Sequence, residues 1–290
     1  MYSKPTPREI LETLLPHLRM AAAYARQIQP MIATLPSKDE GDNFFAAALT
    51  DADVAVQNLV EVVLLGSFPQ ISFYGEEFEL SSNTKYFRSL KLEESGDYLI
   101  TLDPIDGTQF YKDGHTNYQI ILGVLGASEY EAVLAITPAL NVYFYAIKGE
   151  GTFRGPLEAD LEACEPLKVT EYQQSILLGW SMGKLTAALQ EHYQVIDVAT
   201  CYSKEAPMPN LNGILSGDIA GAAIRRGKFI DGAAIAFLAK EAGCIVTTFD
   251  GSEPPPLSEC SDYSLPGLLV ASSKSVHQHL LEAVQWGMGN

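Results

Sequence analysis

The length, composition and charge of the chain exclude several classes of protein. It has 290 residues, of which 47% are apolar, and a formal net charge of −17. This acidic balance argues against binding to a nucleic-acid polymer or an anionic membrane, because both normally require a basic surface. There is no run of about 18 apolar residues that would cross a bilayer, and the start Met1–Pro5 lacks the apolar stretch of a signal peptide. We therefore expect a cytoplasmic protein that is large enough to bury its own core.

The first predicted element is a helix that begins after Thr6. Thr6 is a suitable N-cap, Pro7 fits the first helical position, and Glu9 completes a capping box. Apolar residues then recur at helical spacing as far as Ala21. We expect Pro16 to kink this helix.

A second helix is predicted after Thr50, ahead of an apolar run that begins at Val54. Thr50 and Asp53 have the spacing of a capping box. A structural role as a cap and a role of Asp53 in a functional site are compatible, because an acidic side chain in the first turn also favours the helix dipole.

An acidic pair follows a strand-like segment. Residues 70–74 are rich in strand formers, and Gly75-Glu76-Glu77 comes next. Only one of the two adjacent carboxylates can point the same way as the inner face of the strand. Taken alone, the segment is most simply a solvated turn.

The most informative segment is Asp103-Pro104-Ile105-Asp106-Gly107-Thr108. The preceding residues predict a strand, so Asp103 should lie at its carboxyl end, where α/β sheets usually bind ligands. Pro104 fixes the turn. The carboxylates of Asp103 and Asp106, with the Ile105 carbonyl, are oxygen donors of the kind that Mg²⁺ prefers. Gly107 and Thr108 would open a helix whose free N–H groups bind anions, and the alternative is a polar turn in which Asp106 caps that helix.

Three strands separated by turns are expected between Asn117 and Ile147, which indicates an antiparallel sheet. Helical stretches are expected near residues 182–192 and 216–226. A further Ala-rich helix follows Asp231, which is either a simple helix cap or a site residue.

The stretch from Gly155 to Pro166 is the best boundary along the chain. We predict an N-terminal α+β half, residues 1–155, that carries most of the site. A C-terminal α/β half, residues 156–290, would supply Asp231 and the substrate contacts.

Several motifs occur together, in the order found in a known family of enzymes. They are Thr50-Asp51-Ala52-Asp53, Gly75-Glu76-Glu77, Asp103 to Thr108, Asp231-Gly232-Ala233-Ala234, Glu241-Ala242-Gly243 and Leu268 to Ser273. On these motifs the chain resembles the inositol monophosphatase superfamily of Mg²⁺-dependent, lithium-sensitive phosphatases over most of its length. The resemblance implies an α/β fold, the layered α/β/α/β/α sandwich of the sugar phosphatases, and a homodimer.

The resemblance also implies which residues bind the two or three Mg²⁺ ions. One ion would be held by Glu76, Asp103 and the carbonyl of Ile105. A second would be held by Asp103, Asp106 and Asp231, so that Asp103 bridges the two, while Glu77 supports the ligands.

The same resemblance implies the catalytic set Glu76, Asp53 and Thr108. Asp53 would hydrogen-bond Thr108, whose hydroxyl helps to orient the attacking water. The backbone amides of Gly107 and Thr108 would bind the phosphate oxygens.

The chain departs from the inositol-specific members just before Asp231. Residues 227–230 lead directly into Asp231, without a longer acidic segment and with Ile230 in place of Trp. Two interpretations remain open for the neighbouring basic residues: they contact a second anionic group of the substrate, or they complement the dipole of a helix that ends there. These residues are Arg225, Arg226 and Lys228.

The sequence therefore predicts a Mg²⁺-dependent phosphomonoesterase that acts on a small phosphorylated metabolite. Inositol monophosphate-like substrates lead over a 3′(2′),5′-bisphosphate nucleotide and a fructose 1,6-bisphosphate-like sugar. Paired cations neutralise the phosphate, stabilise the leaving oxygen and activate water, so that no covalent nucleophile is required. The competing class is a non-catalytic family member that binds or regulates.

Overall fold

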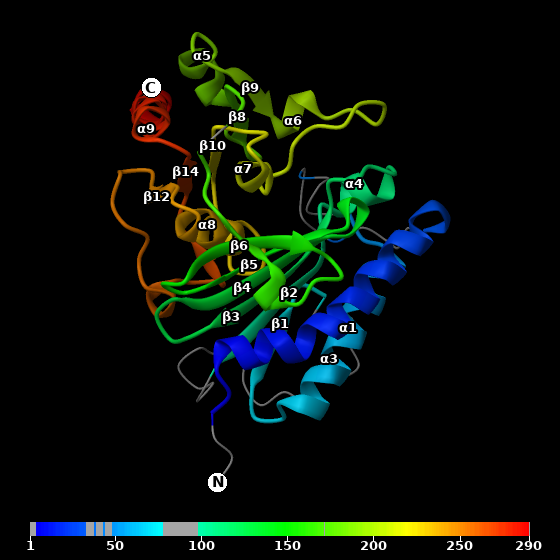
Figure 1. The fold of residues 1–290 in the computed structure, drawn as a ribbon. Helices are drawn as coiled ribbons and strands as arrows, with labels where there is room; N and C mark the ends of the chain where they lie inside the picture. The colour runs from blue at the N-terminus through cyan, green and yellow to red at the C-terminus, as the bar shows by residue number, and fades with distance from the viewer. Residues whose placement is uncertain are drawn as a thin grey trace. The chain divides into compact units, whose positions relative to one another are not determined.

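The computed structural model of the protein describes residues 4–32, 38, 43, 48–77, 98–170 and 172–289. The chain divides into two compact units, residues 1–148 with 153–165, and residues 149–152 with 166–290. Figure 1 shows the helices and strands of both units, which together make a mixed α/β fold as expected. None of the helices in the described ranges combines the length and apolar character needed to cross a bilayer.

A seven-stranded sheet, with β1 to β5 wholly within the first unit, has the order β1-β2-β3-β4-β5-β6-β7 in the described part of the chain. β1 is parallel to β2, and the pairs from β2 to β5 are antiparallel. This confirms the antiparallel sheet predicted for residues 117–147. The strands are β1 (Ser72–Gly75), β2 (Leu99–Asp106), β3 (Gln119–Leu125), β4 (Tyr130–Thr137), β5 (Val142–Ile147), β6 (Gly151–Pro156) and β7 (Glu165–Leu167).

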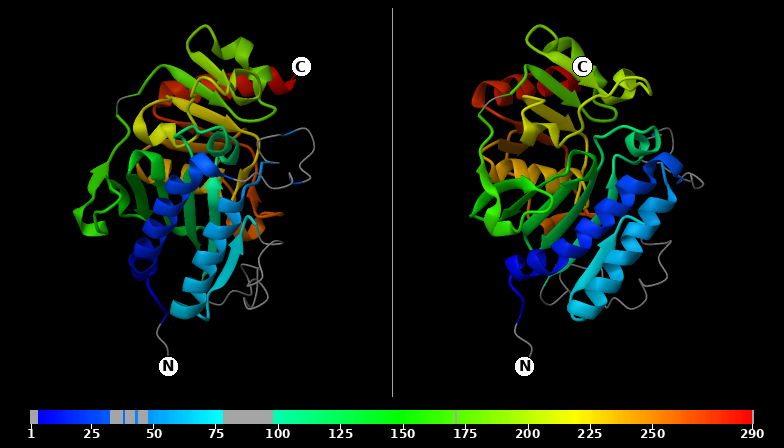
Figure 2. Two further views of the ribbon diagram at one scale, coloured as in Figure 1. Left: turned by 90° about the vertical axis from the view of Figure 1, so that its right-hand side faces the viewer. Right: turned by 45° about the vertical axis from the view of Figure 1, so that its right-hand side comes forward.

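Two long helices pack against each other and against this sheet (Figure 2). α1 (Pro7–Ile28) begins with the predicted capping box between Thr6 and Glu9, and α3 (Asp51–Ser67) begins after Thr50. Pro16 lies inside α1, which continues to Ile28. The apolar stripe of α1 is fully buried, which explains the helical spacing of its leucines. The short elements of this unit are η1 (Gln29–Met31), α4 (Thr108–Lys112), η5 (Pro138–Leu140) and η6 (Leu161–Ala163).

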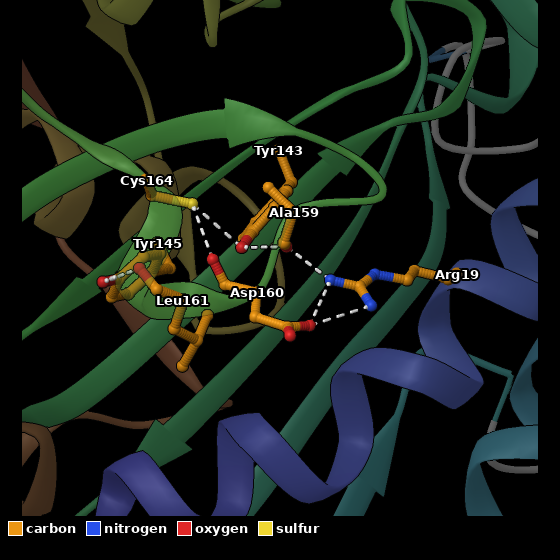
Figure 3. A network of polar contacts seen from close by, with 7 residues as sticks. All are labelled: Arg19, Tyr143, Tyr145, Ala159, Asp160, Leu161 and Cys164. Atoms are coloured by element: carbon orange, nitrogen blue, oxygen red, sulfur yellow. Dashed lines mark hydrogen bonds and ion pairs between the residues drawn. The ribbon is translucent and has the colours of Figure 1, made fainter.

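A polar network fastens the last segment of the first unit to its sheet (Figure 3). The hydroxyls of Tyr143 and Tyr145, both on β5, donate to the carbonyls of Ala159 and Leu161 at 2.8 and 2.9 Å. Arg19 on α1 donates to the Ala159 carbonyl and pairs with the Asp160 carboxylate at 3.2 Å. Because the Asp160 side chain is largely exposed, the backbone contacts hold this segment more than the ion pair does.

A five-stranded mixed sheet forms the framework of the second unit in the described ranges, in the order β12-β14-β10-β8-β9. β10, β8 and β9 are parallel, whereas β14 is antiparallel to both β10 and β12. A short ribbon pairs β11 with β13. The strands are β8 (Ser175–Leu178), β9 (Gln194–Asp197), β10 (Gly221–Ile224), β11 (Gly227–Lys228), β12 (Ile245–Thr248), β13 (Ser264–Leu265) and β14 (Leu268–Ala271).

The C-terminal helix α9 (Lys274–Gly289) packs on β10 and β14. Its residues Val276 and Leu280 are buried against alternate residues of the strands. Ser273 precedes the helix and accepts from the backbone N–H of Val276 at 3.3 Å, as its sequence suggests. The other helices of this unit are η7 (Gly183–Leu185), α5 (Thr186–Leu189), α6 (Val198–Cys201), α7 (Gly213–Ser216), α8 (Gly232–Glu241) and η8 (Leu257–Glu259).

The helix predicted for residues 216–226 is wrong. α7 ends at Ser216, where Gly217 adopts a left-handed backbone with φ of 81°, and the Ala-rich residues that follow form the central strand β10. A Cβ on Gly221 would lie 2.8 Å from the Val270 carbonyl and 2.9 Å from Val276, so packing beneath α9 requires a small residue there. Tertiary packing therefore overrides the helical preference of alanine.

The same correction removes one interpretation of the basic cluster. Arg225 and Arg226 follow a strand, not a helix, so they do not complement a helix dipole. Both side chains are exposed, and Arg226 lies 3.6 Å from the carboxylate of Asp262, which is also exposed.

Candidate active site

Parallel pairing of β1 and β2 brings two acidic motifs together in the first unit. Gly75 lies opposite Leu102, and the backbone N–H of Glu76 donates to the Leu102 carbonyl at 3.0 Å. Glu76 and Asp103 therefore directly follow the last residues paired between β1 and β2, near the edge where α/β sheets commonly bind ligands. Glu77 and Asp103 are each only 3% exposed.

The part of β2 that follows Asp103 is irregular and is held by the Asp103 side chain. The carboxylate of Asp103 accepts from the backbone N–H of Ile105 at 3.1 Å, across Pro104. The pairing of β2 with β3 shifts register between Asp103 and Asp106, so a local irregularity separates the two carboxylates. Gly107 then adopts φ of 85°, a left-handed conformation that favours glycine, and opens the five-residue helix α4.

Thr108 is held by the residue that the motifs assign to it. Its hydroxyl lies 3.1 Å from a carboxylate oxygen of Asp53 and 2.9 Å from the Ile105 carbonyl. The other oxygen of Asp53 accepts from the backbone N–H of Thr50 at 2.9 Å and from its hydroxyl at 2.5 Å. Asp53 thus caps α3 and holds Thr108 at the same time, so the two sequence interpretations of this residue coexist.

Burial makes the charge state of Asp53 sensitive to pH. The side chain is fully buried. Burial raises the pKa of Asp53 to about 7, the Thr50 hydroxyl opposes this, and the nearby carboxylates of Glu76 and Glu77 add to it. Because the folded pKa is above the unfolded value, the protein loses stability from this group as pH rises from about 4 to about 7.

We expect Asp53→Asn to become more stable relative to the parent protein as pH rises. The amide cannot ionise, so the variant lacks the loss of stability that ionisation of Asp53 imposes between pH 4 and 7. Thermal unfolding of both proteins across this range, in chelator to exclude bound cations, measures the difference. Parallel curves, with a gap that does not change with pH, would contradict the raised pKa of Asp53.

Lys38 is a site residue that the sequence did not suggest. Its ammonium group lies 3.0 Å from a carboxylate oxygen of Glu76 and 2.6 Å from one of Glu77. Burial alone would lower the pKa of Lys38, but the two carboxylates outweigh burial and hold it above its usual value. Glu76 and Glu77 therefore already share one positive charge.

Gln57 braces the acidic pair from α3. Its amide oxygen accepts from the backbone N–H of Glu77 at 2.8 Å, and its amide nitrogen donates to Glu61 at 3.0 Å. A Cβ on Gly75 would lie 2.2 Å from the Gln57 oxygen, so glycine leaves room for this contact. Gln57 stands one helical turn after Asp53, a spacing that could have marked it in the sequence.

Asp106 is positioned across the sheet by a buried glutamine. Gln119 is directly opposite Asp106 in the β2–β3 pairing, and its amide nitrogen donates to the Asp106 carboxylate at 2.6 Å. Nothing in the sequence motifs identified Gln119, because the contact depends on the register of two strands.

Asp231 belongs to the second unit, where it is the N-cap of α8 and accepts from the backbone N–H of Gly232. The following Glu241-Ala242-Gly243 motif has structural roles. The Glu241 carboxylate accepts from the backbone N–H groups of Gly149 and Gly151 at 3.1 and 3.2 Å, and Gly243 ends the helix with φ of 95°.

The donor set fits a hard cation. The predicted ligands are carboxylate and carbonyl oxygens, which Mg²⁺ prefers, and Glu76 and Glu77 already hold a cationic group. Within the described ranges, no three Asp, Glu, His or Cys side chains converge closely enough to hold an ion as they stand. The metal-ligand set therefore stays a prediction.

The mixed α/β fold and the acidic residues that follow its parallel strand pair fit one class, the metal-dependent hydrolases of phosphoric monoesters. The chain belongs to the Inositol monophosphatase family, whose profile matches residues 14–287. This confirms the resemblance found in its motifs.

Three characterised relatives are similar to this chain. "Inositol-1-monophosphatase ImpA" of Mycolicibacterium smegmatis is 27% identical over 259 residues, covering 86% of this chain and 82% of that protein. "Histidinol-phosphatase" of Streptomyces coelicolor is 26% identical over 246 residues, covering 80% and 82%. "Fructose-1,6-bisphosphatase/inositol-1-monophosphatase" of Thermotoga maritima is 29% identical over 126 residues, so that the chain spans 44% of its length.

Solved structures agree with the fold. The Thermotoga maritima IMPase superposes with a TM-score of 0.72 at 20% identity, covering 97% of this chain and 98% of that one. At this identity the similarity supports the architecture and not a substrate.

Proposed function

We propose that the protein is a Mg²⁺-dependent phosphomonoesterase that hydrolyses a small phosphorylated metabolite resembling inositol monophosphate. The observation that carries the proposal is that Glu76 and Asp103 directly follow the paired residues of β1 and β2. The Thr108 hydroxyl, which Asp53 holds, belongs to the same unit. Oxygen donors and an oriented hydroxyl in one unit are what water-driven phosphoryl transfer requires.

The proposed chemistry rests on seven residues of this chain, to which Asp53 and Gly107 add support. Glu76, Asp103, Asp106 and Asp231, with the Ile105 carbonyl, would bind two or three Mg²⁺ ions, and Glu77 would support them. Bound Mg²⁺ would neutralise phosphate charge and lower the pKa of water. Thr108 would orient the attacking water.

Asp53 would contribute to catalysis by orienting the hydroxyl of Thr108. An ionised Asp53 accepts the hydrogen of the Thr108 hydroxyl, which leaves the hydroxyl oxygen free to accept a hydrogen from water. The backbone N–H groups of Gly107 and Thr108 would meet the phosphate oxygens, as the resemblance implies. No covalent intermediate is needed, because positioning and electrostatics dominate phosphoryl transfer.

A bisphosphate is the second candidate substrate. Arg225 and Arg226 are exposed on the segment that leads to Asp231, and Lys228 lies on β11. Such cations suit a second phosphate group, as in a 3′(2′),5′-bisphosphate nucleotide or a fructose 1,6-bisphosphate-like sugar. A non-catalytic binding or regulatory role ranks below both, because all the predicted ligand residues are present. We also propose a homodimer, from the family resemblance alone.

Phosphate release should depend on added Mg²⁺ and cease in chelator. We expect a panel of inositol 1-phosphate, adenosine 3′,5′-bisphosphate and fructose 1,6-bisphosphate to show the highest kcat/KM for the inositol ester. Inorganic phosphate released with Mg²⁺, with chelator, and with Mg²⁺ restored measures this directly. Lithium in the same assay should inhibit, as the family resemblance implies.

The panel separates the competing functions. A higher kcat/KM for either bisphosphate would replace the inositol ester with that substrate class. Folded protein that releases no phosphate from any member of the panel would favour the binding or regulatory role. Turnover unaffected by chelator would overturn the metal-dependent mechanism.

A further inference from the structure

The buried Gln119 pairs across the strands with the half-buried Asp106, and only the nitrogen end of its amide is hydrogen-bonded. Gln119 is fully buried and lies directly opposite Asp106 in the β2–β3 pairing. Its amide nitrogen donates to the Asp106 carboxylate at 2.6 Å, a short charge-assisted hydrogen bond. Its amide oxygen is buried and has no hydrogen-bond partner among the described residues.

The orientation of the Gln119 amide is determined by Asp106. A flip of the amide would place its oxygen against a carboxylate oxygen at hydrogen-bond distance, and two acceptors cannot bond there. The NH₂ group therefore faces Asp106, and the amide oxygen must find a donor elsewhere. A buried acceptor left without a donor is costly, by roughly 1 to 3 kcal/mol. Such a group in a folded protein usually indicates a ligand or an ordered water.

We infer that Gln119 is a positioning residue of the cation site, with a double role. Its NH₂ group fixes the Asp106 carboxylate for the cation, and its amide oxygen accepts a hydrogen bond from a water of the cation's hydration shell. Mg²⁺ suits this arrangement because it keeps several of its waters, and every such water presents hydrogens. The inference rests on the proposed function, because it takes Asp106 as a cation ligand.

The role of the Gln119 amide oxygen as an acceptor depends on the charge of the species that binds beside Asp106. A carboxylate or a fully ionised phosphate offers only acceptors to the Gln119 oxygen, whereas water next to a cation is a stronger donor than bulk water. A Gln at this position therefore selects a hydrated cation over a bare anion beside Asp106.

We expect Gln119→Met to weaken Mg²⁺ binding about 10- to 100-fold, the usual effect of removing a group that orients a metal ligand. Methionine has similar length and no hydrogen-bonding amide. Gln109→Met is the matched control, because Gln109 is a buried glutamine on α4 whose amide bonds to Asp113 and not to Asp106. Calorimetric titration of each purified protein with Mg²⁺ measures the affinity. Turnover of Gln119→Met should need an about 10- to 100-fold higher Mg²⁺ concentration than the parent protein to reach half of its maximal rate.

The Mg²⁺ titrations and the phosphate-release assay together separate the role of Gln119 from the proposed function. Equal Mg²⁺ affinities in the parent, Gln119→Met and Gln109→Met, with normal turnover in the parent, would overturn the role of Gln119 alone. A parent that binds Mg²⁺ more tightly than Gln119→Met but releases no phosphate would overturn the proposed function alone. A parent that binds no Mg²⁺ would overturn both.

A structure of the parent protein with Mg²⁺ provides a test that does not depend on the folding of a variant. It should show a water within about 3 Å of the Gln119 amide oxygen and within the coordination shell of an ion bound by Asp106. An ion at Asp106 with no donor at the Gln119 oxygen would contradict the inference.

Discussion

Replacing Asp103 with Asn should lower kcat/KM for phosphate release by at least about a thousandfold, since groups that merely support metal ligands already contribute 10- to 100-fold. Asp103 is nearly fully buried within β2, directly after Leu102, whose carbonyl accepts from the backbone N–H of Glu76. In the proposed site Asp103 would help to hold two cations, so the loss of its charge would weaken the binding of both. Steady-state kinetics over a range of Mg²⁺ concentrations measures the effect.

Glu77→Gln is the matched comparison for Asp103→Asn. Both substitutions replace a buried carboxylate with its isosteric amide, and both side chains are 3% exposed. Glu77 is proposed to support the ligands without bridging the ions, so its variant should retain more activity, about 1 to 10% of the parent rate. Comparable residual rates in the two variants would contradict the bridging role of Asp103.

Replacing Thr108 with Val should lower kcat by about a hundredfold and leave KM nearly unchanged. Valine keeps the shape of the side chain but removes the hydroxyl that lies between Asp53 and the Ile105 carbonyl. Groups that move or orient protons during the reaction typically contribute 10² to 10⁴ to the rate. Steady-state kinetics at saturating Mg²⁺ separates kcat from KM.

Thr108→Ser is the rescue control, because serine restores the hydroxyl without the methyl group. Its kcat should lie close to that of the parent protein. If Thr108→Val retains full kcat, the attacking water is oriented by another group. If serine and valine lower kcat equally, the methyl group and its packing matter more than the hydroxyl.

Local sequence signals predicted the elements that hold the first unit together. The capping boxes at Thr6 and Thr50 depend on side chains three residues apart, so spacing alone predicts them. The strand that leads into Asp103 was also predicted, but it does not stop at Pro104 as expected, because β2 continues with a local irregularity to Asp106. The segment at 216–226 was not predicted correctly, because its strand conformation is imposed by Val270 and Val276, which are distant in sequence.

The residues of the candidate site likewise divide into those that the sequence motifs identified and those that only tertiary contacts reveal. The contact between Asp53 and Thr108 was implied by the motifs and is present. Lys38 and Gln119 were missed, since neither has a motif of its own and their partners are set by tertiary structure and by strand register. A glutamine opposite an aspartate becomes visible only when the β2–β3 alignment is known.

The ammonium group of Lys38 pairs with both Glu76 and Glu77, and this bears on how folding and the binding of a divalent ion are related. Neighbouring carboxylates repel each other, and many metalloproteins cannot complete their structure until an ion arrives to relieve that repulsion. This chain carries an internal counter-ion for the purpose. With Lys38 in place, the repulsion between Glu76 and Glu77 is already offset, and an ion that binds as proposed would replace one counter-ion with another.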